Sequence, residues 1–120
     1  MHQALRLILT LSAAWLLTAC ATPARPLSAP EQARLAALLP ADALLVGEQH
    51  DAPEHQQLQR QIVDWLAARG DLAALAMEMA ERPRTTAGLS RDASESAVRA
   101  ALAWDEAGWP WATYGPVVMA

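Results

Sequence analysis

Hydrophobic residues at helical spacing predict two helices in the first half of the chain. One begins at Ser28, which suits an N-cap, with Glu31 three residues later as its capping-box partner. The other begins with Asp51 as its cap, runs to about Arg69 and carries its large apolar residues on one face. We expect Gly70 to end this helix, because glycine readily adopts the left-handed backbone of a C-cap.

Two short apolar runs, residues 43–47 and 72–79, lie on either side of the second helix. Neither run alternates apolar with polar residues, and such runs are typical of strands buried on both faces of a parallel sheet. The order strand, helix, strand gives a βαβ unit with a right-handed crossover. The fold class that we expect is therefore α/β, a βαβ-based parallel sheet flanked by helices. We also expect it to be truncated, because two strands alone do not form a stable sheet.

The second half of the chain predicts one clear helix and an aromatic segment. Residues 81–90 form a polar loop, and a helix follows from Ser94 to Leu102. Residues 104–116 combine three tryptophans with prolines, glycines and the single tyrosine, and Val117 begins a further helix. The aromatic side chains can form a flat wall for a planar ligand or a packed lid, and the sequence leaves both interpretations open.

The amino terminus resembles a bacterial lipoprotein signal peptide. Arg6 precedes an apolar run, residues 7–17, that is too short to span a membrane, and the run leads into Leu-Thr-Ala-Cys20. This order of a branched apolar residue, two small residues and cysteine matches a lipobox, in which the cysteine thiol receives the lipid. The alternative is an ordinary secretory signal followed by a chance cysteine.

The lipobox divides the chain into three parts. Residues 1–19 are expected to be a removed signal peptide, residues 20–27 a tether, and residues 28–120 the N-terminal, incomplete part of an α/β domain. Acylation of Cys20, for example with palmitate, would hold the lipoprotein at a membrane. By resemblance to lipoprotein sorting rules, Ala21 favours the outer membrane, so we expect the protein in the cell envelope, facing the periplasm.

The charge of the chain bears on its partners. The formal net charge is −4 at pH 7, and all nine basic residues are arginine. A nucleic-acid partner is not expected, because binding to phosphates requires a basic surface. Cys20 is the single cysteine, so an exported chain has no internal disulfide.

Acidic and imidazole side chains follow both predicted strands. Glu48 and His50 come directly after residues 43–47, and Glu78 stands near the end of residues 72–79. Ligands of open parallel sheets bind beyond the carboxyl ends of the strands, and neighbouring strands lie about 5 Å apart. We therefore expect the three side chains to share one crevice. Two carboxylates and an imidazole suit either a divalent metal ion or acid–base chemistry.

Each of these residues also has a purely structural interpretation. Glu48 can cap the following helix, and His55, in the first turn of that helix, can be a solvated histidine. Glu78 lies within an apolar run, and buried acids are rare without a partner, which favours a function for it.

The order of these residues resembles the ChaN-like lipoproteins of the haem-binding uptake/Tiki superfamily. The matching segments are Gly47-Glu48-Gln49-His50-Asp51 with Pro53, His55 and Gln59, then Ala76-Met77-Glu78-Met79, Trp109-Pro110-Trp111, and Tyr114 with Pro116. Together they cover roughly residues 43–120. The resemblance identifies the chain as an N-terminal fragment of a longer ChaN-like protein. Whether the 120-residue chain is a functional product or a truncated fragment stays open.

The resemblance implies a lipid-anchored protein that binds haem or iron, acts in haem uptake, forms a homodimer and does no covalent chemistry. It implies haem contacts from Glu48, His50, His55, Glu78 and Tyr114. In other branches of the superfamily it implies metal-dependent hydrolysis. The alternative is therefore an esterase- or protease-like enzyme in which Glu48, His50 and Glu78 bind a divalent metal ion that activates water.

Overall fold

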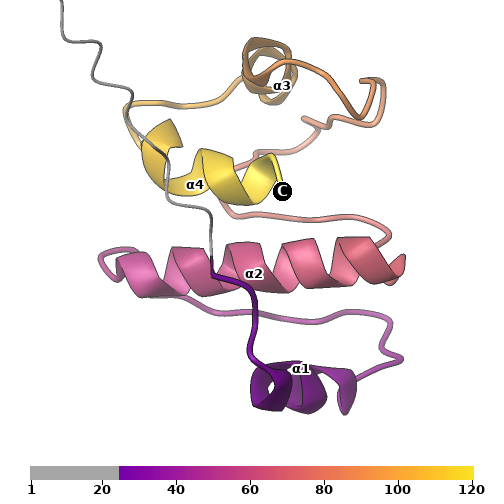
Figure 1. Cartoon of the computed structure of the whole chain (residues 1–120). Coiled ribbons are helices and arrows are strands. Elements are labelled where there is room, and N and C mark those ends of the chain that lie inside the picture. The colour runs from indigo at the N-terminus through magenta and orange to yellow at the C-terminus, as the bar shows by residue number, and fades with distance from the viewer. Residues whose placement is uncertain (1–24) are drawn as a thin grey trace, which may run out of the picture.

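The computed structural model describes residues 25–120, and the regular secondary structure in this range is entirely helical. The helices are α1 (Ala29–Ala36), α2 (Pro53–Arg69), α3 (Glu95–Leu102) and α4 (Trp111–Val118). Figure 1 shows α2 at the centre, with α1 on one side of it and α3 and α4 on the other.

The expected parallel sheet is missing from residues 25–120, so the α/β prediction is wrong. Residues 43–47 and 72–76 have no regular secondary structure and follow an extended course beside α2 (Figure 1), but no backbone hydrogen bond between these two segments is present. Leu45 is 93% exposed, whereas a strand covered on both faces would bury it. A lone parallel pair has no neighbour on either outer edge, so one ladder of hydrogen bonds would have to offset the entropy lost by both segments.

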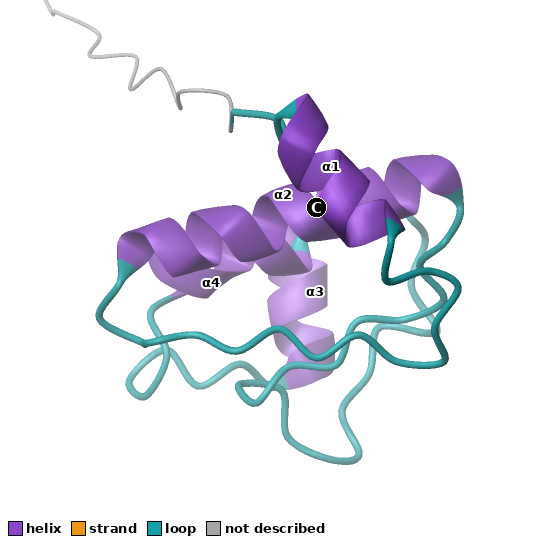
Figure 2. Cartoon of the chain, turned by 90° about the horizontal axis from the view of Figure 1, so that it is seen from below, coloured by secondary structure: helices purple, strands orange, loops and turns teal. Residues whose placement is uncertain are grey.

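The two extended segments nevertheless lie against the same side of α2. Val46 from the first segment and Leu75 from the second line one cavity together with Val63 of α2. Figure 2 shows the connecting loops running beneath α1 and α2 instead of forming a layer of strands. The segments that carry the predicted site residues are therefore brought together by packing against α2, without a sheet.

Local sequence signals set the ends of α1 and α2. The backbone N–H and the hydroxyl of Ser28 both donate to the Glu31 carboxylate, so the predicted capping pair is confirmed. Gly70 caps the C-terminus of α2 with φ of 74°, as predicted. The prediction of Asp51 as the α2 cap is wrong. Residues 49–52 form a hydrogen-bonded turn, so Ala52 is the N-cap and Pro53 the first helical residue.

The ends of α3 agree with the prediction from the sequence, whereas the start of α4 does not. Ser94 caps α3, since its Oγ accepts a hydrogen bond from the backbone of Ala97, and the helix ends at Leu102 as predicted. Helix α4 begins at Trp111, well before the predicted start at Val117. The Glu106 carboxylate accepts a hydrogen bond from the Trp111 backbone N–H, which satisfies a donor that the helix leaves free.

Apolar burial occurs in two adjoining groups. Val98 and Leu102 of α3 pack with Trp111 of α4 in one cluster. Helix α4 also packs against α2, and Tyr114 and Val117 are each only 2% exposed. Burying a side chain of this size stabilises a fold by roughly 1.5–3 kcal/mol, so α4 joins α2 to the aromatic part of the chain.

The predicted signal peptide and Cys20 lie outside the described residues. Leu27, the last residue of the predicted tether, is buried, so this end of the tether is part of the packed structure. Within residues 25–120, none of the helices combines the length and the apolar character needed to cross a membrane.

Candidate functional site

The turn that follows the first extended segment places Glu48 and His50 in contact. His50 Nδ1 lies 2.7 Å from Glu48 Oε1, and the Glu48 side chain is only 7% exposed. A buried carboxylate needs hydrogen-bond donors, and the imidazole supplies one. This bond also fixes the orientation of the ring, because it ties one nitrogen to the protein and turns the other away from Glu48.

Two further side chains complete the surroundings of Glu48. Gln56 Nε2, from the first turns of α2, donates to Glu48 Oε2 at 3.2 Å. Tyr114 of α4 also contributes, because its hydroxyl lies 3.5 Å from His50 Nδ1. Side chains of α2 and α4 therefore both contact the pair formed by Glu48 and His50.

Glu78 reaches the same imidazole from the turn that follows the second extended segment. Its Oε2 lies 3.8 Å from His50 Nε2, and its side chain is 71% exposed. At this exposure the attraction between the two groups is weak. The structure thus brings Glu48, His50 and Glu78 together as expected, with one acid buried and the other accessible.

His55 is not part of the group formed by Glu48, His50 and Glu78. Its Nδ1 accepts a hydrogen bond of 3.0 Å from the backbone N–H of Gln49. The bond closes the turn that carries Glu48 and His50, which we call the motif turn. His55 therefore stabilises the shape of this turn and adds no further side chain to the group of Glu48, His50 and Glu78.

The aromatic residues contact each other edge to face. Trp109 meets the His50 ring at 5.0 Å between centroids and the Tyr114 ring at 5.5 Å, with interplanar angles of 71° and 86°. The Trp104 indole N–H donates to the Trp109 carbonyl at 2.8 Å. This arrangement favours the packed lid over the flat wall. Trp109 is the aromatic residue of this lid that contacts His50.

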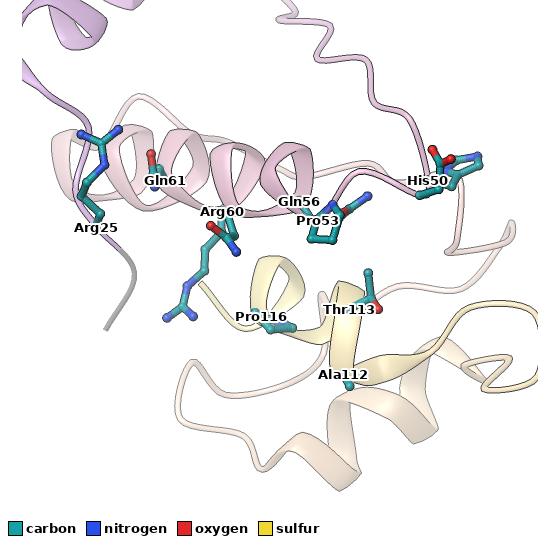
Figure 3. A pocket seen from close by; sticks show the side chains of 11 residues that line it. Arg25, His50, Pro53, Gln56, Arg60, Gln61, Ala112, Thr113 and Pro116 are labelled. Carbon is teal, nitrogen blue, oxygen red and sulfur yellow. The ribbon is translucent and has the colours of Figure 1, made fainter. Parts of the chain in front are cut away.

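Two cavities meet at His50. One, which we call the motif cavity, has a volume of about 430 Å³ and contains Glu48 and Glu78 in its lining together with apolar residues of both extended segments and of α2. The other, the α2–α4 cavity, has a volume of about 660 Å³ and lies between those two helices (Figure 3). Both volumes are in the range of small-molecule sites. His50 lines both.

Glu48, His50 and Glu78 are arranged as a row. In residues 25–120, no group of three or more His, Cys, Asp or Glu side chains is placed so that it could hold a metal ion. The two nitrogens of His50 face different carboxylates, so the side chains do not converge on a shared point. Metal ligation by Glu48, His50 and Glu78 stays a prediction.

Comparison with known proteins assigns the chain to a family. The family model described as haem-binding uptake, Tiki superfamily, ChaN matches residues 34–120. The chain belongs to the ChaN family. No curated protein and no solved structure gave a significant match. The matched range includes all the segments that carry the resemblance to this family. The resemblance is therefore confirmed, and the family-level function is haem binding and uptake.

The donor set of this ChaN-family chain fits a haem group. His50 is half exposed and lines the motif cavity, where an imidazole nitrogen is accessible beside apolar walls. Tyr114 fits less well as an iron ligand, because it lines neither of the two cavities. Burial raises the pKa of the Tyr114 phenol, and the charges of Glu48 and Glu78 raise it further, so the hydroxyl keeps its proton.

Two polar residues at the cavities of the ChaN-family chain carry no clear signal in the sequence. Gln56 is the one buried polar or charged residue among residues 25–120, yet a glutamine in a helix that is rich in glutamine looks solvated. Arg60 lines the α2–α4 cavity, although its spacing from Asp64 is that of an ordinary surface ion pair. Both depend on how α4 and the motif turn pack on α2.

Proposed function

We propose that this chain is a lipid-anchored haem-binding protein that acts in haem uptake, with His50 as the iron ligand. The observation that carries the proposal is the position of His50. Its Nδ1 is held 2.7 Å from the buried Glu48 carboxylate, and the ring lines a cavity of about 430 Å³ with apolar walls.

The hydrogen bond to Glu48 prepares His50 for ligation. As a carboxylate, Glu48 only accepts hydrogen bonds, so the neutral imidazole carries its proton on Nδ1 and keeps a lone pair on Nε2. Partners that bind the other ring nitrogen are a general feature of metal-ligating histidines, since they fix the tautomer and raise the basicity of the ligand.

Glu78 marks the entrance on the Nε2 side of the ring. Its carboxylate is accessible and only 3.8 Å from Nε2, in a contact that contributes little stability. A ligand that reaches Nε2 would displace this carboxylate into water at small cost. Bound haem would supply an iron centre, while the apolar walls of the motif cavity would cover part of its hydrocarbon surface.

The anchor is supported by the sequence of the amino terminus. The lipobox ending at Cys20 provides the acylation site, and the outer membrane facing the periplasm is the location that we propose. Incorporation of labelled palmitate into the wild type but not into Cys20→Ala would test the anchor. The homodimer implied by the family resemblance remains a prediction.

A haemin titration tests the ligand. Haemin added to the full chain in detergent is expected to give a shifted Soret band, and His50→Ala should lose it. His55→Gln is the matched control, because it removes an imidazole that lines neither cavity, while its amide oxygen can still accept the hydrogen bond from the Gln49 backbone N–H, so it should retain the band. A Soret band of unchanged position and affinity in His50→Ala would contradict the proposal.

A further inference from the structure

The α2–α4 cavity shares only His50 with the motif cavity, and the rest of its polar lining is its own. It is bounded by Gln57, Arg60 and Gln61 of α2, by Thr113 of α4, and by Arg25 near the start of the described chain. Figure 3 shows Arg25 and Arg60 toward one end of the cavity and His50 toward the other. The lining also includes the acid Asp51, which is next to His50 in the sequence, so the positive charge is confined to the arginine end.

This positive end stands out in an acidic chain, whose net charge is −4. Each arginine has one carboxylate nearby. Arg25 pairs with Glu31 at 3.3 Å, and Arg60 Nε lies 3.6 Å from Asp64. All four side chains are at least partly exposed, and ion pairs of this kind contribute little. The guanidinium groups therefore retain donors for another anion.

Arg60 carries the strongest sign of an absent partner. Its Nε is buried and makes no hydrogen bond within residues 25–120, although the Asp64 carboxylate lies 3.6 Å from it. The cost of a buried donor without an acceptor is about 1–3 kcal/mol. An anion bound at this end of the cavity would draw the guanidinium away from Asp64, and the Nε–H and an Nη–H could then donate to two of its oxygens at once.

The remaining residues that line the cavity favour an organic anion over an inorganic one. Pro53, Ala112 and Pro116 give the cavity an apolar portion beside the polar groups. A volume of about 660 Å³ also exceeds what a single small ion occupies. The amides of Gln57 and Gln61 are available to orient a ligand with further oxygens.

We propose that the α2–α4 cavity binds a small organic acid whose carboxylate lies against Arg60, with Arg25 adding positive charge. This inference is independent of haem binding, because Arg60 does not line the motif cavity. Inorganic phosphate shares the oxyanion chemistry but leaves the apolar portion of the cavity uncovered.

Calorimetric titration of the full, haem-free chain with citrate, and separately with inorganic phosphate, tests the proposal. Citrate should bind the wild type, and Arg60→Gln should weaken it by roughly tenfold or more, as expected for loss of a charged hydrogen-bonded pair. Arg69→Gln is the matched control on the same helix, since Arg69 stacks over Trp65 and pairs with Asp71 outside the cavity. Its citrate affinity should match that of the wild type.

Three results would overturn the proposal. These are no citrate binding by the wild type, an equal loss in Arg60→Gln and Arg69→Gln, or phosphate binding as tightly as citrate. If circular dichroism shows that Arg60→Gln is unfolded, Arg60→Lys decides in its place. It keeps the charge but loses the planar fork, so citrate affinity should still fall, and unchanged affinity would contradict the assignment.

Discussion

Gln56 links the fold to the proposed ligand at the scale of single residues. Its side-chain amide donates to Glu48 at 3.2 Å and to the Gln49 carbonyl at 3.3 Å, and the residue is 5% exposed. Glu48 in turn sets the ring of His50. Gln56 therefore acts through other residues, as a positioning residue for the imidazole.

Replacing Gln56 by leucine should destabilise the chain by about 1–3 kcal/mol, because the buried Glu48 carboxylate and a backbone carbonyl each lose a donor. Urea unfolding measures the loss. Gln57→Leu, at an exposed neighbouring position, should change stability by no more than about 0.5 kcal/mol. Equal effects of the two variants would show that the network around Glu48 contributes nothing.

The sequence predicts only part of this residue-level picture. Glu48, His50 and Glu78 are predicted to meet because the first two follow one apolar run and Glu78 stands near the end of the other, and they do share a cavity. The supporting role of Gln56 is not predictable, since a polar residue on a helix becomes buried only when a turn distant from it folds back. The hydrogen bonds around Glu48 therefore depend on how the turn packs against α2, and the sequence alone does not specify them.

At the scale of elements, the helix ends follow from local chemistry. Ser28 and Gly70 act as predicted because capping involves only residues within one turn of the helix end. Asp51 fails as a cap because a competing turn at residues 49–52 takes up the chain before Pro53. The helices themselves are thus largely readable from the sequence, with errors where two local structures compete.

The cap of α1 predicts a pH dependence. The hydrogen bonds from Ser28, first from its hydroxyl and then from its backbone, lower the pKa of Glu31, and Arg25 lowers it further. Because the folded-state pKa lies below the unfolded value, this stabilisation is present above the ordinary glutamate pKa of about 4.3. It is lost as the pH falls through the lowered value.

Thermal unfolding followed at a series of pH values checks this dependence. The wild type should be more stable than Glu31→Gln at neutral pH, and the difference should shrink as the pH falls through the acid range. A difference that stays constant down to the lowest pH at which the chain folds would contradict the capping account.

At the scale of the whole molecule, the apolar runs show where sequence reasoning fails. Residues 43–47 and 72–76 have the composition of buried strands, yet a strand exists only if a partner pairs with it. Pairing is a non-local property, and a run of apolar residues does not specify it. In the described chain these segments cover one side of α2 and leave Leu45 and Leu75 exposed.

Leu45 distinguishes the observed arrangement from the expected sheet. Leu45→Asp should change the free energy of unfolding by no more than about 0.5 kcal/mol, because the side chain is already 93% exposed. The matched control is Val63→Asp in α2, which places a charge at a buried position and should be strongly destabilising. A large loss of stability in Leu45→Asp, measured by urea unfolding, would indicate a buried strand.

The central claim is that Glu48 holds His50 so that Nε2 is presented to the motif cavity. Long-range ¹H–¹⁵N correlation of the histidine side chains, in the haem-free chain above the pH at which histidine is protonated, tests this directly. We predict that His50 carries its proton on Nδ1, and that Glu48→Ala lets the proton move to Nε2. A proton on Nε2 in the wild type would contradict the account, because the nitrogen proposed to bind iron would then lack a free lone pair.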